Sequence, residues 1–285
     1  MLRRSGMAGL LFLVLAILFI FAGCSDNSTG NNKVVGDPNA PEFQNMKAAI
    51  ASSVDSTMSI MLRFAANPGR VAPQDTMNLR PDWGVLNPED TLLHNWVNGW
   101  NIVYLGLTTG ADYNRTLVDS VRFFIENNAL DRYFSYHVNK MDFIHHQTDT
   151  YKGSGDSHQN SSTYVDVDYT GVSIGNNGYS VSRSTLDGSG KFVWDDYYQM
   201  IGGTVHDNYQ LNATFNAVEF VQTASQPWTP GIATSGTITL TATVTTAEIE
   251  ETWTATVTFS STGTAQITAT TGNTEYSYQM TPTYQ

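Results

Sequence analysis

The sequence predicts a mainly β fold, an antiparallel β-meander with one N-terminal amphipathic helix. Three observations indicate this class. Apolar and polar residues alternate through the C-terminal part of the chain, and one stretch near the N-terminus has helical spacing. Charged residues make up only 14% of the chain, against about 25% in typical soluble domains. We expect the strands to form a curved sheet, a sandwich or a partial barrel.

The first 24 residues have the organisation of an export signal. Arg3 and Arg4 precede an unbroken apolar run of 13 residues, Leu10 to Ala22. This run is too short for a membrane-spanning helix, which needs about 20 apolar residues, and a basic head before a short apolar middle is typical of a secretory signal. The segment Phe21-Ala22-Gly23-Cys24 resembles the lipobox of bacterial lipoproteins, and Cys24 is the only cysteine of the chain.

This resemblance implies a lipid anchor. The signal peptide is then residues 1–23, cleavage falls between Gly23 and Cys24, and Cys24 carries a diacylglyceryl group on its sulfur and an acyl chain on its new amino group. Ser25 implies sorting to the outer membrane, with the outer face of the cytoplasmic membrane as the alternative. The competing interpretation is an ordinary cleaved signal followed by an incidental cysteine.

The chain after the signal divides into a tether and a single domain. Residues 24–39 are polar and rich in Gly and Asn, without apolar periodicity, which predicts a flexible segment. Residues 40–285 contain no internal linker, so we expect one mostly β domain. Removing residues 1–23 takes away two arginines and no acid, which changes the formal charge from −12 to −14. A nucleic-acid partner is not expected, because such partners need a basic surface.

A helix is predicted at about residues 40–66. Apolar side chains recur there at spacings of three and four, on one stripe: Phe43, Met46, Ile50, Val54, Met58, Met61 and Leu62. Asn39 and Glu42 have the spacing of a capping box, and Asn67-Pro68-Gly69 ends the pattern. The stripe is expected to pack against the sheet. The alternative is an adaptable ligand-facing surface formed by its methionines.

The middle of the chain is less regular. Residues 70–97 are expected to be mostly irregular, with a helical turn at Asp90–Val97, and Trp100–Leu107 is a short apolar run typical of a strand. Residues 116–125 fit both a helix and a strand, and the neighbouring strands favour a strand.

From Thr163 onward strict alternation predicts strands. Along Tyr209–Ala217 the odd-numbered residues are apolar, and the apolar parity then switches to Val218 and Phe220, which predicts a β-bulge. The final strands have one apolar and one Thr-rich face, with tight turns at Ser261-Thr262-Gly263 and Thr271-Gly272-Asn273.

Two motifs invite an enzymatic interpretation. Gly155-Asp156-Ser157 resembles the start of the SGNH (GDSL-type) hydrolases, which place their serine after an apolar strand and supply an Asp-x-x-His pair later. Here a polar segment precedes Gly155, and the Asp-x-x-His pair, Asp142 and His145, comes before the serine. We therefore expect no catalytic residues.

Metal and cofactor sites are not expected either. His145 and His146 are neighbours that point to opposite faces of a strand, so they cannot easily share one ion. Asp166 and Asp168 share a face, but no Gly-containing loop accompanies them, as a calcium site requires. The acidic pairs Asp195-Asp196 and Glu250-Glu251 are interpreted as solvated positions, and the aromatic group Trp194, Tyr197 and Tyr198 as packing residues.

The predicted function is a non-catalytic binding or scaffolding role in the cell envelope, with the membrane as partner through the lipid on Cys24. A glycan, a lipid or an envelope protein is the expected further partner. The first alternative is a carrier of lipid or another apolar ligand, with a cavity between sheet and helix lined by Met58, Met61, Val257 and Phe259. The second is an envelope hydrolase, which requires titratable groups that converge in a cleft.

Overall fold

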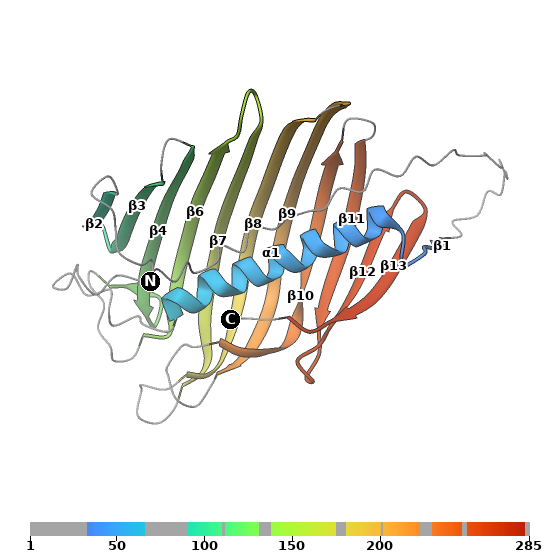
Figure 1. The fold of residues 1–285 in the computed structure, drawn as a ribbon. Coiled ribbons are helices and arrows are strands. Elements are labelled where there is room, and N and C mark those ends of the chain that lie inside the picture. The colour runs from blue at the N-terminus through green and yellow to red at the C-terminus, as the bar shows by residue number, and fades with distance from the viewer. Residues whose placement is uncertain are drawn as a thin grey trace, which may run out of the picture. The chain divides into compact units, whose positions relative to one another are not determined.

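A single open sheet, mostly antiparallel, contains nearly all the secondary structure of this computed structural model (Figure 1). The structure describes residues 33–65, 91–109, 112–130, 138–174, 181–200, 202–222, 230–246 and 250–282. The strands are β1 Val34–Val35, β2 Thr91–Val97, β3 Trp100–Thr109, β4 Tyr113–Ile125, β5 Asn128–Ala129, β6 Lys140–Lys152, β7 His158–Ile174, β8 Val181–Met200, β9 Gly203–Gln222, β10 Pro230–Thr245, β11 Glu250–Phe259, β12 Ala265–Thr271 and β13 Thr274–Met280.

The strands follow one another in the sheet almost as they do in the chain. The order is β1-β13-β12-β11-β10-β9-β8-β7-β6-β4-β3-β2, and the short β5 pairs with β4. All neighbours are antiparallel except β1 and β13, which are parallel. The prediction of a mainly β antiparallel meander is confirmed, and so is the strand at residues 116–125, which lies within β4.

The helical turn expected at Asp90–Val97 is wrong, because residues 91–97 form strand β2, paired with β3 over its whole length. Pairing supplies the backbone hydrogen bonds that a lone helical turn would leave unmade, and this tertiary contribution outweighs the local sequence preference.

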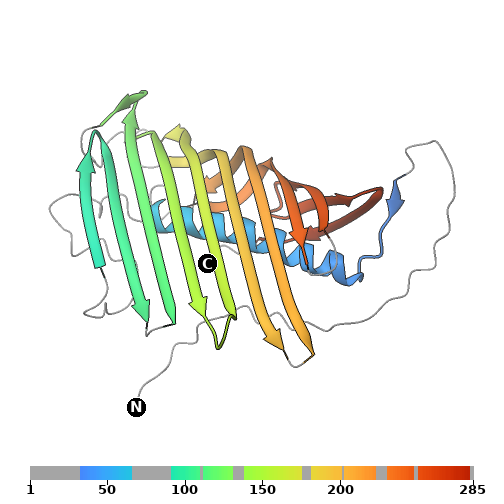
Figure 2. The same ribbon diagram turned by 90° about the horizontal axis from the view of Figure 1, so that it is seen from above.

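One helix, α1, spans Pro41–Ala65, as predicted for residues 40–66. It lies along one face of the sheet and runs from the β13 side toward β4 (Figures 1 and 2). We call this face of the sheet the inner face and the opposite one the outer face. At the start of α1, Phe43 stacks on Tyr276 of β13, with ring centroids 4.3 Å apart.

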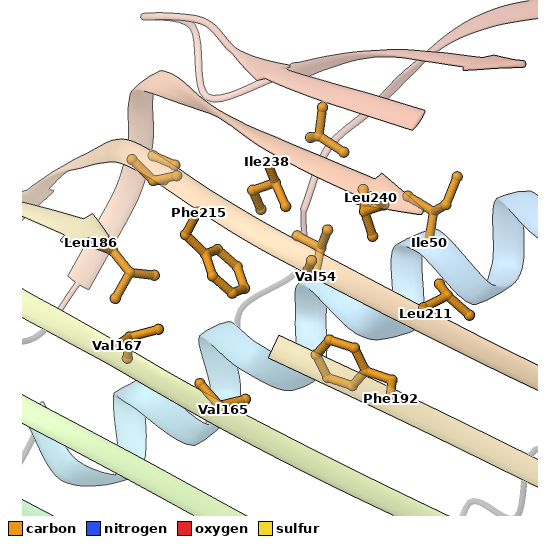
Figure 3. Close-up of a cluster of buried hydrophobic side chains, with 14 of the residues drawn as sticks. Ile50, Val54, Val165, Val167, Leu186, Phe192, Leu211, Phe215, Ile238 and Leu240 are labelled. Atoms are coloured by element: carbon orange, nitrogen blue, oxygen red, sulfur yellow. The ribbon is translucent and has the colours of Figure 1, made fainter. Parts of the chain in front are cut away.

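The apolar stripe of α1 is buried against the inner face. Ile50 and Val54 belong to the same buried cluster as Phe192 of β8, Leu211 of β9 and Leu240 of β10 (Figure 3). The side chains of Met58, Met61 and Leu62 lie outside the described part of the structure. For the described part of the stripe, packing against the sheet is therefore the observed arrangement, which removes apolar surface from water.

The predicted bulge lies in β9 and is confirmed. Phe215 and Val218 are both buried, and the two exposed residues between them restore the inward direction of the next apolar side chains. Ala217 has a φ of 46°, and Gly236 opposite it has a φ of 92°. A Cβ atom at position 236 would lie 2.3 Å from the carbonyl oxygen of Ala217. Position 236 of β10, beside the bulge of β9, therefore requires glycine.

The expected lipid anchor and signal peptide lie outside the described residues, as do Gly23, Cys24 and residues 66–69. The described portion of the tether includes β1. Within the described ranges, no helix combines the length and the apolar character that crossing a membrane requires.

Candidate binding surface on the inner face

The inner face changes character toward one end of the sheet. We call this the upper end, because it is uppermost in Figure 1; it carries the turns that follow β6, β8 and β12. On β8, Phe192 is buried, whereas the next inward-facing residues, Trp194, Asp196 and Tyr198, are only half-buried. Strands β6 to β9 extend above the line of α1 at this end (Figure 1).

Register places polar and aromatic side chains beside these residues. We define the polar surface as the half-buried polar and aromatic residues on the inner face of β4 and β6 to β9 at the upper end. Its members are Tyr113, Arg115, Gln147, Asp149, Gln159, Ser161, Trp194, Asp196, Tyr198, Asp207 and Tyr209.

Asp149 is the centre of a hydrogen-bond network on the β4 and β6 side of this surface. Its Oδ1 accepts from the hydroxyl of Tyr113 at 2.6 Å and from Nε of Arg115 at 2.5 Å, and its Oδ2 accepts from Nε2 of Gln147 at 2.6 Å. Burial by itself would raise the pKa of Asp149, but these donors outweigh it and lower the pKa below its usual value. Burial and the bond to Asp149 raise the pKa of Tyr113 to about 12.

The β8 and β9 side of the surface is aromatic and acidic. Trp194 is directly opposite Tyr209 and is stacked with Phe192, whose ring centroid is 6.3 Å away. One step further up, Asp196 is opposite Asp207. Two like charges facing each other across strands destabilise a sheet.

Burial is the first cause of the raised pKa values on this side, and neighbouring charges add to it for Asp196. Burial and then the charges of Asp207 and Asp195 raise the pKa of Asp196, and burial raises the pKa of Asp207. The pKa of Tyr209 rises to about 12, because the ring is buried and acidic groups lie near it. This side therefore disfavours additional negative charge.

A hydrogen bond joins two more members of the polar surface, since Nε2 of Gln159 on β7 donates to the Tyr198 hydroxyl. Side-chain amides, hydroxyls and carboxylates thus lie beside the half-buried ring of Trp194, which stacks on the buried Phe192. Such a surface offers apolar ring faces together with donors and acceptors, the combination that fixes polar ligands in protein sites.

The acidic and aromatic residues that are neighbours in the sequence at positions 194–198 are divided between the two faces of the sheet. Trp194, Asp196 and Tyr198 face inward, whereas Asp195 and Tyr197 face outward. On the outer face Asp195 contacts Nε2 of His206 at 2.8 Å and Nε2 of His158 at 3.5 Å, and Tyr197 stacks with His158 at 5.3 Å between ring centroids. Burial opposes ionisation of Asp195, but the bonds from His206 and Asn208 lower its pKa.

Sequence reasoning missed a buried polar pair. His145 on β6 and Asp119 on β4 are opposite each other, 0% and 2% exposed, with Nδ1 of the imidazole 2.6 Å from Oδ1 of the carboxylate. Nε2 of His145 is buried and has no hydrogen-bond partner among the described residues. No local signal links positions 26 residues apart, so only strand pairing identifies this pair. His146 is exposed on the outer face, as strand alternation predicts.

The remaining candidates are spread over the surface. Ser157 lies in the turn between β6 and β7, where its Oγ accepts from the backbone amide of Gln199 at 3.3 Å, and Nδ1 of His158 is directed to the Asp156 carbonyl. Asp166 and Asp168 are exposed on the outer face. Among the described residues, no group of three or more His, Cys, Asp or Glu side chains is arranged to hold a metal ion.

Comparisons with known proteins do not assign this chain to a family. No family model matches it, and neither the curated proteins nor the solved structures contain a match.

Proposed function

We propose that this chain is a lipid-anchored cell-envelope protein that binds a glycan, without catalysis, on its polar surface. The observation that carries the proposal is the contrast along β8, where a buried Phe192 is followed by half-buried Trp194, Asp196 and Tyr198. Sugars present hydroxyl groups and apolar C–H faces, and a surface of amides, carboxylates and aromatic rings matches both.

The negative charge of the chain favours an uncharged ligand over an anionic one. The mature chain carries a formal charge of −14 once the signal is removed, and after burial the charges of Asp207 and Asp195 raise the pKa of Asp196, so carboxylates already lie close together there. A polyanionic ligand would be repelled there. A nucleic-acid partner is excluded from the proposal for the same reason.

Packing favours a binding surface over a carrier of apolar ligands. Ile50 and Val54 of α1 share one buried cluster with the sheet, and Val257 and Phe259 are buried as well. A carrier needs an apolar cavity of several hundred Å³ in this position. We also propose that the sheet curves partway around α1 as a partial barrel, since one continuous sheet supports this form better than a two-sheet sandwich.

The proposed location is the outer membrane, with the outer face of the cytoplasmic membrane as the alternative. The lipobox-like residues Phe21-Ala22-Gly23-Cys24 support it. Two or more acyl chains hold a protein stably to a bilayer. Replacement of Cys24 by Ala is expected to leave the precursor uncut and unacylated, which the intact mass of the membrane-extracted protein measures.

Glycan binding is tested with a pair of substitutions on one strand. We expect the purified chain to be retained by neutral oligosaccharides on a glycan array, and Trp194→Ala to weaken that binding at least about tenfold, as loss of an aromatic anchor does. Tyr197→Ala is the matched control, because Tyr197 lies on the same strand but on the outer face, and it should bind as the parent does. Failure of the parent chain to bind any neutral glycan, or equal affinity of the Trp194 variant, refutes the proposal.

A further inference from the structure

The polar surface forms a strip across five neighbouring strands. Strand register aligns one row of half-buried inner-face residues across β4, β6, β7, β8 and β9, and its members are Arg115, Asp149, Ser161, Trp194 and Tyr209. The next row toward the upper end consists of Tyr113, Tyr151, Gln159, Asp196 and Asp207. Because neighbouring strands lie about 4.8 Å apart, each row is about 19 Å long from β4 to β9.

Aromatic side chains lie at both ends of this strip. Trp194 and Tyr209 are opposite each other on β8 and β9 at one end, and Tyr151 and Tyr113 are opposite each other on β6 and β4 at the other end. Directly opposite residues of an antiparallel pair project to the same face, so Tyr151 shares the inner face with Tyr113. Tyr151 is 46% exposed, and its ring is therefore accessible to a ligand as a second aromatic contact.

Polar side chains lie between the two aromatic ends. Ser161 and Gln159 on β7 offer a hydroxyl group and an amide oxygen there. Beside them, Arg115 and Asp149 form an ion pair with 2.5 Å between Nε and Oδ1, so their charges cancel. Hydrogen-bonding groups with little net charge suit the hydroxyl groups of a neutral sugar chain.

A single sugar ring is too small to contact both Trp194 and Tyr151. The two residues are two strands apart and in adjacent rows, which corresponds to about 12 Å between their Cα atoms. A sugar ring that stacks on Trp194 is centred over that side chain, and Tyr151 then lies beyond the contact distance of about 4.5 Å between heavy atoms. Simultaneous contact with both therefore requires a ligand of several linked rings.

We infer that the strip binds a linear, neutral oligosaccharide that runs across the strands, with one sugar ring on Trp194 and another, further along the sugar chain, on Tyr151. This inference rests on the glycan binding proposed above and adds the form of the ligand. Two contacts made by one sugar chain reinforce each other, because the second forms at the effective concentration that the first creates. The affinity should therefore rise with the number of sugar rings until both aromatic residues are contacted.

The inference is tested with sugar chains of increasing length. The purified chain is titrated by calorimetry with linear oligomers of glucose, mannose, xylose and N-acetylglucosamine, from the monosaccharide to the hexasaccharide of each. In a series that binds, we expect the hexasaccharide to bind at least about tenfold more tightly than the shortest member with measurable affinity.

Tyr151→Ala separates the second aromatic contact from the first. Because Tyr151 is exposed, its truncation should leave the thermal stability unchanged. We expect the affinity for the shortest binding member to stay as in the parent and the affinity for the hexasaccharide to fall about tenfold. Trp194→Ala should weaken binding at every length. Tyr164→Ala is the matched control, since Tyr164 is an exposed tyrosine on the outer face of β7, and it should bind as the parent does.

The outcomes distinguish this inference from the proposed function. An affinity that does not change with the length of the sugar chain, or a hexasaccharide affinity that Tyr151→Ala leaves unchanged, overturns the inference while glycan binding at Trp194 stands. Absence of binding to every member of every series refutes the proposed function, and the inference with it.

Discussion

The lower and upper parts of the inner face belong to the same strands but differ in what covers them. Beneath α1, strand residues such as Phe192 and Leu211 are fully buried and apolar. Two residues further up β8 and β9, Trp194 and Tyr209 are half-buried, and charged side chains follow. A sheet face needs apolar residues only where another element excludes water. The boundary between core and candidate site therefore follows the edge of the helix and not any break in a strand.

The sharpest test of this boundary compares two neighbours on one face. Phe192→Ala removes a buried ring and is expected to lower the free energy of unfolding by about 3–5 kcal/mol. Trp194→Ala is expected to cost clearly less stability, because the side chain is only half-buried, while it weakens glycan binding at least about tenfold. Denaturant unfolding of both variants measures the difference. Equal losses of stability in the two variants would show that Trp194 belongs to the core, and would contradict a boundary between core and candidate site at this position.

The buried pair of Asp119 and His145 is a polar exception within the lower, apolar part of the face. Asp119→Ala leaves the imidazole buried without its partner, and we expect a loss of about 2–3 kcal/mol in unfolding free energy. Asp142→Ala on the outer face, whose carboxylate is bonded to Arg122 at 2.7 Å, serves as a half-buried control with a smaller expected loss. A negligible effect of Asp119→Ala would show that the pair contributes no net stability.

The smallest expected effects are changes in the free energy of unfolding, and they have opposite signs on the two sides of the polar surface. The lowered pKa of Asp149 means that its contribution to stability is present above the unfolded pKa of about 3.9 and is lost as the pH falls through the folded pKa. Asp149→Asn should therefore destabilise the chain at pH 7 by about 1 kcal/mol or less, since the group is partly solvated, and the difference should vanish in acid.

Asp196→Asn is expected to act in the opposite direction. Because the folded pKa of Asp196 is raised, the folded state binds its proton more readily, and the ionised group destabilises the fold at neutral pH. The substitution should stabilise the chain slightly at pH 7, by less than about 1 kcal/mol, and the gain should fade as the pH drops through the raised pKa. Urea unfolding at several pH values measures both variants, and the same sign for the two would contradict the assignment.

Sequence patterns predicted most elements because burial on one face imposes alternation on a strand. The parity switch at Val218 located the bulge in β9, and the apolar stripe at Phe43, Ile50 and Val54 located α1. The strand at Thr91–Val97 was missed, since Leu92, Leu93 and Trp96 do not alternate and β3 supplies the pairing that makes it a strand. The polar surface was missed because Trp194 and Tyr198 resemble core aromatics in the sequence.

By itself the sequence determined which side chains share a face, where the helix begins and ends within a residue or two, and the lipobox-like segment that leads to the proposed anchor. These features depend on the local period of a strand or helix, which neighbouring residues carry. Only the tertiary structure decided that Asp119 meets His145, that Asp196 meets Asp207, and that within the described part of the chain the residues of the polar surface are half-buried and those beneath α1 are fully buried. Those relations depend on register between distant strands and on the placement of one helix, and no short stretch of sequence contains either.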